Sequence, residues 1–228
     1  MAPRPPFGYP WAVPLREGVL DGQGFHETGP PQRLPAGRSP VLASGSNASP
    51  EVVRDKLGST LGDGPAHQVV FTPVLVPGLG VGHSAHVSRP GYVAAAPYRT
   101  QGPGTHRAPT YVLGWFTCAQ LDRLDATEPQ YRRVSLPDDM PVHTRSGGQV
   151  VSGVQLYVSR HGLIAERGTP VPLRSQTETF DWLRDHLTCL RGRTMQAYAD
   201  ADLREQVRVE LVDRGWTSPS RLERPAQA

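Results

Sequence analysis

Residues 40–58 read PVLASGSNASPEVVRDKLG, and this stretch decides the fold. The apolar residues 41–43 predict a short strand. Helix signals follow closely: Ser49 suits the N-cap, Pro50 suits the first helical position, and Glu51 places negative charge in the first turn. We therefore expect a strand, a tight turn and a helix that ends before the next glycine, an arrangement typical of a domain that mixes α and β elements.

The remaining expected elements share clear apolar patterning. They are strands at 69–76, 92–96, 110–116, 131–136 and 150–158, a short helix at 119–125, and two helices between 177 and 215. The apolar stripes of the last two helices predict either faces that pack on the core or the surface of a homodimer. The fold class expected from this order is α/β (α+β), in one domain.

Glycine and proline divide the chain into parts. They are most frequent in residues 1–38 and 77–109, where we expect little regular structure apart from the strand at 92–96. We expect residues 1–38 to form an N-terminal arm whose aromatic residues lie on the domain. The core should span 39–160, and a C-terminal helical extension at 161–228 should pack on it.

The charge balance excludes some classes of partner. The chain has 24 basic and 21 acidic residues, a net charge of +3, and no dense basic run, so no nucleic-acid partner is expected.

No apolar run approaches the roughly 18 residues of a transmembrane helix, and the N-terminus lacks the apolar segment of a signal peptide. We expect no membrane association and a cytoplasmic location. Cys118 and Cys189 form neither a disulfide framework nor a metal-ligand pattern.

The turn Gly45-Ser46-Asn47 is the first candidate site. Main-chain amides in a tight turn before a helix can bind an anion. Gly45 permits a positive φ or a close approach, and the other two side chains add short donors. With no further glycine or lysine in the turn, such a site suits a carboxylate better than a pyrophosphate. Turns of this composition are more often purely structural.

Glu128 is the second candidate. It follows the predicted helix at 119–125 and precedes Pro129 and the strand at 131–136. A carboxylate at such a junction can point into a site, where it could take a proton from an ammonium group and pass it to a leaving amine. Taken alone, Glu128 is better explained as an exposed loop residue or a helix cap than as a catalytic group.

Together, the two candidates resemble the gamma-glutamylcyclotransferase-like family. Residues 111–134 follow its pattern of a strand ending near glycine, then L-x-x-L-D-x-x-E-x-x-Y-x-R-x-x-V. The positions in register are Leu121, Leu124, Asp125, Glu128 and Tyr131, with Arg133 fitting approximately. The family's other signature is a Y-G-S-N loop between the first strand and first helix, which residues 45–47 match in chain order. The resemblance covers about residues 39–160.

The resemblance implies a mixed β-barrel with surrounding helices, to which this chain adds C-terminal helices. It implies that Ser44, Gly45, Ser46, Asn47 and Tyr131 bind the amino-acid end of a γ-glutamyl substrate, with loop amides on the α-carboxylate. Glu128 would be the general acid/base of a lyase or transferase that releases 5-oxoproline and an amine. The partner would be a small γ-glutamyl or amino-acid-like molecule, with no metal and no cofactor.

The chain departs from the family at three places. Ser44 stands where the loop usually has tyrosine, Pro129 stands where a small residue usually follows the glutamate, and residues 77–109 form a Pro/Gly/His-rich insertion. Two alternatives therefore stay open. The pocket could bind a small ligand or a protein segment without turnover, or residues 78–109 and the arm could form a partner-binding surface beside a vestigial pocket.

Other reactive residue types receive structural assignments. We expect surface or loop positions for the histidines, core or pocket packing for three tyrosines, and a buried small hydrophobe at Cys118. The histidines are His83, His86, His106 and His143, and the tyrosines are Tyr92, Tyr98 and Tyr111. No acidic cluster accompanies the histidines, so a metal site is not expected.

Overall fold

The computed structural model describes residues 5–11, 13–29, 34–100 and 111–223. Four α-helices are assigned in this part of the chain: α1 (Pro50–Leu57), α2 (Cys118–Ala126), α3 (Gln176–His186) and α4 (Ala201–Asp213). Short 3-10 helices complete the helical elements: η1 (Pro6–Gly8), η2 (Ser46–Ala48), η3 (Gly58–Thr60), η4 (Thr188–Leu190) and η5 (Met195–Ala199).

The larger sheet contains the strand predicted at 41–43 as an interior strand with a neighbour on each side. Its order is β10 (Val150–Val151), β9 (Val142–Thr144), β4 (Val69–Leu75), β7 (Tyr111–Phe116), β3 (Ser39–Ala43), β11 (Gln155–Ser159) and β8 (Tyr131–Ser135). The hairpin of β1 (Gly18–Leu20) and β2 (Phe25–Glu27) joins it through β4. All these pairs are antiparallel except β3 with β11, which is parallel. The sheet is therefore mixed.

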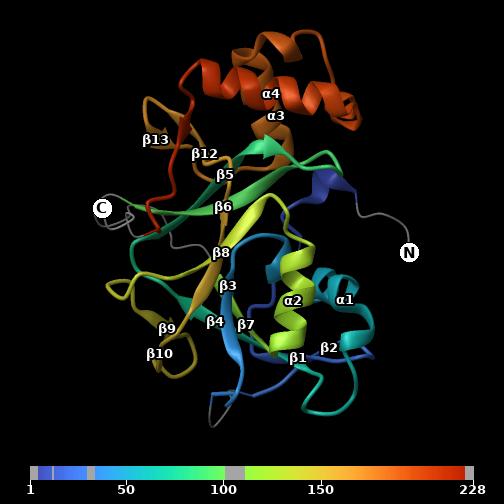
Figure 1. Ribbon diagram of the computed structural model, residues 1–228, viewed down its shortest axis with the longest axis vertical. Coiled ribbons are helices and arrows are strands. Elements are labelled where there is room, and N and C mark those ends of the chain that lie inside the picture. The colour runs from blue at the N-terminus through green and yellow to red at the C-terminus, as the bar shows by residue number, and fades with distance from the viewer. Residues whose placement is uncertain (1–4, 12, 30–33, 101–110, 224–228) are drawn as a thin grey trace.

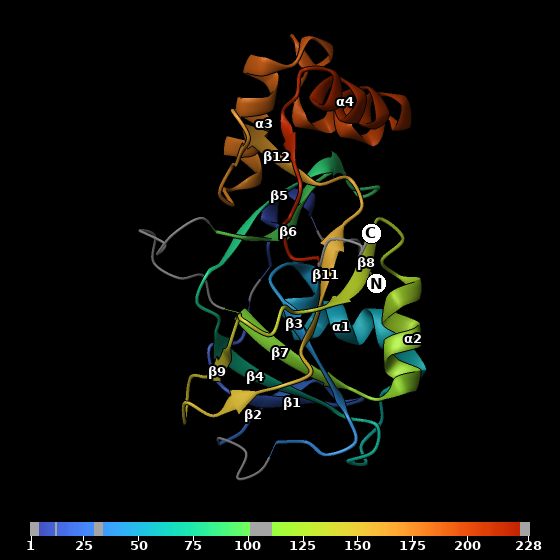
Figure 2. The same cartoon turned by 60° about the vertical axis from the view of Figure 1, so that its left-hand side comes forward.

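The smaller sheet has the order β13 (Thr169–Pro170), β12 (Leu163–Glu166), β5 (Leu79–Val87) and β6 (Val93–Arg99). A short strand, β14 (Thr217–Ser218), pairs with β12. Figure 1 shows this sheet above the larger one, with α3 and α4 over it and with α1 and α2 beside the larger sheet. The same two tiers remain separate after the rotation in Figure 2.

The apolar stripes of the C-terminal helices face the core. Their stripe residues are buried together with Ala85, Val87 and Val93 of the smaller sheet. These stripe residues are Phe180, Leu183, Leu187, Leu190, Leu203, Val207 and Leu211. Of the two roles that the sequence left open for the stripes, core packing is the one observed.

The expected mixture of helices and sheets is confirmed, but the expected closed barrel is wrong. The described strands form two open sheets that end in β10 and β8, and in β13 and β6.

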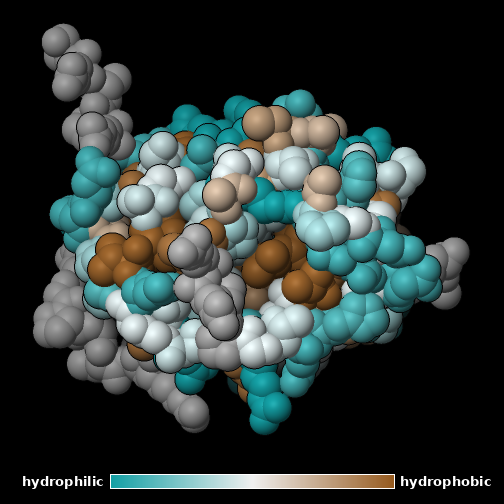
Figure 3. All heavy atoms as spheres, turned by 90° about the horizontal axis from the view of Figure 1, so that it is seen from below, coloured by the Kyte–Doolittle hydropathy of each residue, from teal (hydrophilic) through white to brown (hydrophobic). Residues whose placement is uncertain are grey.

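None of the described helices combines the length and apolar character needed to cross a bilayer. From below, hydrophobic atoms lie in separate areas among hydrophilic side chains (Figure 3).

The single strand expected at 150–158 is also wrong. The chain leaves β10 after Val151 and re-enters the sheet as β11 at Gln155. Between them Gly153 has a φ of 67°, a left-handed conformation that interrupts an extended strand and that glycine adopts without steric cost. The alternating pattern therefore spans two strands that have different neighbours in the sheet.

The insertion at 77–109 contains a strand that composition did not reveal. β5 runs through its glycines and is buried along its whole length. His83 and His86 lie in β5 and are buried, so their predicted surface or loop positions are wrong. His143 lies in β9 and is half-buried, and His106 falls outside the described residues.

The N-terminal arm lies against the sheets, and it contains more regular structure than expected, namely the β1–β2 hairpin. Tyr9 is buried and stacks on Tyr92 with a centroid distance of 4.3 Å.

The prediction that Cys118 is buried is wrong. It is exposed because it occupies the first turn of α2, whose core contacts are made by Leu121 and Leu124.

Candidate active site

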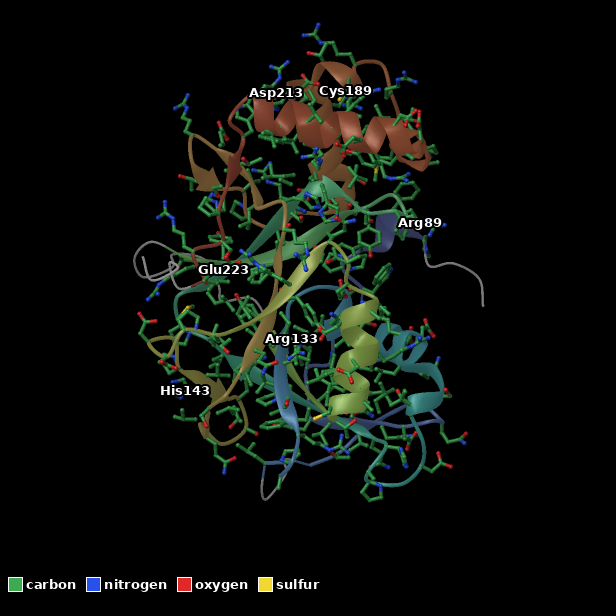
Figure 4. All side chains as sticks on the ribbon, in the orientation of Figure 1. Arg89, Arg133, His143, Cys189, Asp213 and Glu223 are labelled. Atoms are coloured by element: carbon green, nitrogen blue, oxygen red, sulfur yellow. The ribbon has the colours of Figure 1, made fainter. Side chains whose placement is uncertain are left out.

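A pocket of about 650 Å³ lies where four segments of the chain converge. One wall is the loop 44–47 between β3 and α1, and a second is the turn 127–131 between α2 and β8. The β5–β6 hairpin and α4 form much of the remaining lining, to which Tyr9 and Lys56 also contribute. Arg89, at the turn of that hairpin, lines the pocket and is labelled at the right of Figure 4. All six residues assigned to the site from the sequence line this pocket: Ser44, Gly45, Ser46, Asn47, Glu128 and Tyr131.

The loop and the glutamate are in direct contact although 81 positions separate them. Asn47 Nδ2 donates a hydrogen bond to Glu128 Oε1 at 2.9 Å. Lys56 Nζ joins them, at 2.5 Å from Glu128 Oε1 and 2.7 Å from Asn47 Oδ1. A longer contact of 3.3 Å links Lys56 Nζ to Ser46 Oγ. One ammonium group therefore holds the loop and the carboxylate together.

Local sequence explains why the helix begins immediately after this loop. Ser49 is the N-cap residue of α1 and Pro50 its first helical residue, as predicted. The Ser49 side chain makes no capping hydrogen bond; its carbonyl oxygen accepts from Val53 N at 3.0 Å. Lys56 lies in the last turn of α1, and its long side chain reaches back to Ser46 and Asn47 in the loop that precedes the helix.

The turn that carries Glu128 is anchored by its neighbours in the motif. Asp125, at the end of α2, accepts two hydrogen bonds from Arg133 in β8, at 3.0 and 2.7 Å. Tyr157 of β11 donates a third, at 2.6 Å. Arg133 is labelled in Figure 4 between the strand and the helix. This clamp fixes both ends of the turn, which is a physical reason for the Asp and Arg positions in the pattern.

Three polar groups at the contact have no hydrogen-bond partner among the described residues. Both protein contacts of Glu128 use Oε1, and no described residue donates to Oε2. Likewise, no described residue accepts from the main-chain N–H of Gly45 or of Asn47. The Glu128 side chain is 11% exposed and lines the pocket. The pocket lining therefore offers a carboxylate acceptor and main-chain amide donors of the loop.

Tyr9 brings a phenol to the loop from the N-terminal arm, a contact that the sequence analysis did not foresee. Its hydroxyl accepts from Ala95 N at 2.8 Å and lies 2.4 Å from where a Cβ on Gly45 would be. Gly45 has a φ of −133°, so its role is close approach and not a positive φ. Burial raises the pKa of Tyr9 far above its usual value.

The other aromatic groups of the pocket are uncharged at neutral pH. Tyr131 donates from its hydroxyl to Ala95 O at 3.1 Å, and burial raises its pKa well above 10. Burial likewise raises the pKa of Tyr92 to about 12. His86, whose Nδ1 contacts Ser84 Oγ at 2.5 Å, has its pKa lowered to about 4 by burial. These groups therefore contribute hydrogen bonds and apolar surface to the pocket rather than charge.

Glu205 of α4 is a second carboxylate in the pocket lining, but its oxygens are occupied. Arg208 donates from Nε to Oε2 at 2.9 Å and from Nη2 to Oε1 at 2.5 Å. The Glu205 side chain is 60% exposed. Glu128, with a free oxygen and lower exposure, is the better candidate for proton transfer.

Two of the site residues, Lys56 and Tyr9, were missed from the sequence. Lys56 is the only lysine in the chain, a signal that could have identified it. Tyr9 carries no comparable mark. Among the described residues, no group of three or more His, Cys, Asp or Glu side chains could hold a metal ion.

Comparison of the chain with protein-family models, with curated proteins and with solved structures gave no match. The function must therefore be inferred from the geometry of the pocket itself.

Proposed function

We propose that this protein is a gamma-glutamylcyclotransferase-like enzyme that converts a γ-glutamyl amine or amide into 5-oxoproline and a free amine. The observation that carries the proposal is the position of Glu128. Its carboxylate accepts a hydrogen bond from Asn47 of the Gly-Ser-Asn loop and lines the pocket, and no described residue donates to its Oε2.

The proposed reaction needs one proton shuttle and correct positioning. The substrate's α-ammonium group donates to Glu128 Oε2 and transfers a proton to it. The free amine then attacks the γ-carbonyl carbon and forms the ring C–N bond. Glu128 returns this proton to the leaving nitrogen as the original C–N bond breaks. The ring nitrogen loses its second proton as it becomes a lactam N–H, and Glu128 passes that proton to the released amine, which leaves as an ammonium ion. Because the nucleophile belongs to the substrate, holding it near the carbonyl supplies much of the rate enhancement.

Local architecture supports a relationship to that family. The strand, loop and helix of β3, η2 and α1 occur in the expected order. The motif residues of α2 and β8 bring Glu128 to the loop, although the surrounding sheets remain open. Tyr9 could take over the role of the loop tyrosine that Ser44 replaces, because its hydroxyl lies against Gly45.

The test is production of 5-oxoproline from a panel of γ-glutamyl compounds by the full chain. We expect turnover by the wild-type protein, loss of turnover in Glu128→Gln, and retention in Glu205→Gln. Glu205 is the matched control because it lines the same pocket but is already paired on both oxygens. Equal losses in both variants, or turnover that survives in Glu128→Gln, would refute the assignment of Glu128.

A second candidate is a binding protein that holds the same class of ligand without turnover. The Lys56–Glu128 contact favours it, because the carboxylate is already engaged by a cation of the protein itself. Ligand binding without 5-oxoproline, and binding that is unchanged in Glu128→Gln, would favour this candidate over the enzyme.

A further inference from the structure

Lys56 is the chain's single lysine, and its ammonium group is placed inside the pocket. The side chain is 17% exposed. Removing an ammonium group from water is costly unless it is paired and hydrogen-bonded. A cation kept at this depth, where arginine supplies nearly all other positive charge, needs an explanation beyond surface charge.

The three protons of the ammonium group have three acceptors of unequal quality. Glu128 Oε1 and Asn47 Oδ1 lie at 2.5 and 2.7 Å, whereas Ser46 Oγ lies at 3.3 Å. The contact to Ser46 is beyond the usual range of N–H···O distances and is the weakest of the three. One proton of Lys56 can therefore turn to another acceptor at little cost.

The unpaired groups beside Lys56 complement a zwitterion. Glu128 Oε2 is a free acceptor for an ammonium group, and Lys56 with the amides of Gly45 and Asn47 offers positive charge and donors to a carboxylate. An α-amino-acid head carries these two groups on one carbon. On binding, each protein charge would gain a second partner of opposite sign, so neither is left buried and unpaired.

We propose that Lys56 recognises the α-carboxylate of the ligand and, with Glu128, selects molecules that carry a complete α-amino-acid head. This inference rests on the proposed function, because it concerns the same pocket, and it assigns the residue that recognises the α-carboxylate of that substrate. Molecules that have the amine and the γ-amide but lack the α-carboxylate bind weakly. The loop amides alone do not provide this discrimination, because they carry no net charge.

The experiment compares the binding of two amine-bearing amides by isothermal titration calorimetry. L-Glutamine has the α-carboxylate, and 4-aminobutanamide is the same molecule without it. We expect the wild-type protein to bind L-glutamine roughly tenfold or more tightly, the usual effect of one charge-assisted hydrogen bond. In Lys56→Met the ratio of the two affinities falls toward one. Arg208→Met removes a cation that α4 contributes to the pocket lining, and it leaves the ratio unchanged.

A second variant guards against misfolding. Lys56→Gln keeps a donor for Glu128 but no charge, and it should show the same fall in the ratio, with folding of each variant checked by thermal unfolding. Equal affinities in the wild-type protein, absence of binding, or a ratio preserved in a folded Lys56 variant would overturn the proposal. If the ratio falls as expected but no 5-oxoproline forms, carboxylate recognition is correct and the proposed turnover is wrong.

Discussion

The pocket region and the C-terminal helical region each hold a glutamate of low exposure next to a cation, but they use it differently. In the helical region, Glu210 Oε1 accepts from Thr188 N at 2.7 Å and from Arg214 Nε at 2.8 Å. Its Oε2 accepts from Cys189 N at 3.0 Å. In the pocket region, Lys56 and Asn47 both contact Oε1 of Glu128 and leave Oε2 open.

This difference separates a structural carboxylate from one that is available for chemistry. Glu210 of α4 accepts hydrogen bonds from main-chain N–H groups of η4 and so holds the two elements together. Figure 4 shows Cys189 in that upper, helical part of the molecule. Both carboxylate oxygens of Glu210 are engaged within the protein. In contrast, Oε2 of Glu128 has no donor among the described residues and can accept a proton or an ammonium group from a ligand.

The strongest test of this comparison is catalytic. Glu128→Gln should lower kcat/KM at least about 100-fold, because the proton acceptor is lost. Glu210→Gln should leave kcat/KM within about twofold per folded molecule, since it lies outside the pocket lining. Steady-state assays of 5-oxoproline formation measure both, and comparable losses would break the distinction.

Stability should show the reverse order. Glu210→Gln places an amide NH₂ against a main-chain N–H and should lower the free energy of unfolding by about 2 kcal/mol. In Glu128→Gln the new NH₂ can occupy the open Oε2 position, and the amide oxygen still accepts from Lys56 and Asn47. Only the charge of the ion pair with Lys56 is lost, so the loss should be smaller. Denaturant unfolding of the two variants checks this order, and a larger loss in Glu128→Gln would contradict it.

Asp125 extends the comparison because it lies three positions before Glu128 but uses both of its oxygens, like Glu210. Asp125→Asn should cost about 1 kcal/mol, in the range for partly exposed ion pairs. It should reduce kcat/KM by less than tenfold, since it only positions the turn. A loss of activity as large as that in Glu128→Gln would show that engaged oxygens do not identify a structural role.

The smallest expected effect concerns acid. Partial burial alone would raise the pKa of Glu210, but the amide donors of η4 and Arg214 outweigh it and lower the pKa to about 2. An unfolded glutamate titrates near 4.3. Because the folded pKa is the lower one, this stabilisation is fully present above about pH 4.3 and is lost as the pH falls toward 2.

We expect the free energy of unfolding to fall by about 1 kcal/mol from this group across that window, discounted for its position near solvent. Unfolding curves measured between pH 5 and 2 should show a shallower fall in Glu210→Gln than in the wild-type protein. Identical slopes would mean that the glutamate is not held as described.

Local signals predicted the elements that carry the site. The apolar run at 41–43, the proline at position 50 and the glycine at position 58 place β3 and α1 correctly. The motif resemblance also predicted that the loop meets Glu128. That contact joins distant segments, so periodicity and propensity alone could not have located it.

β5 was missed because its glycines indicate a loop by propensity. In the structure they allow close packing: a Cβ on Gly80 would lie 2.6 Å from the Tyr98 ring, and one on Gly82 would lie 2.6 Å from Val171 O. The same burial moves His83 and His86 inside. These constraints come from neighbouring strands, which a local reading of the sequence does not include.

The close approach of Tyr9 to Gly45 restricts which residues can evolve together at these two positions. A side chain at position 45 would collide with the phenol, so position 45 can gain a side chain only where Tyr9 has been replaced by a smaller residue. Among relatives of this chain, we expect a tyrosine at position 9 and any residue larger than glycine at position 45 to exclude each other. Two segments with no shared motif would then be inherited as a linked pair.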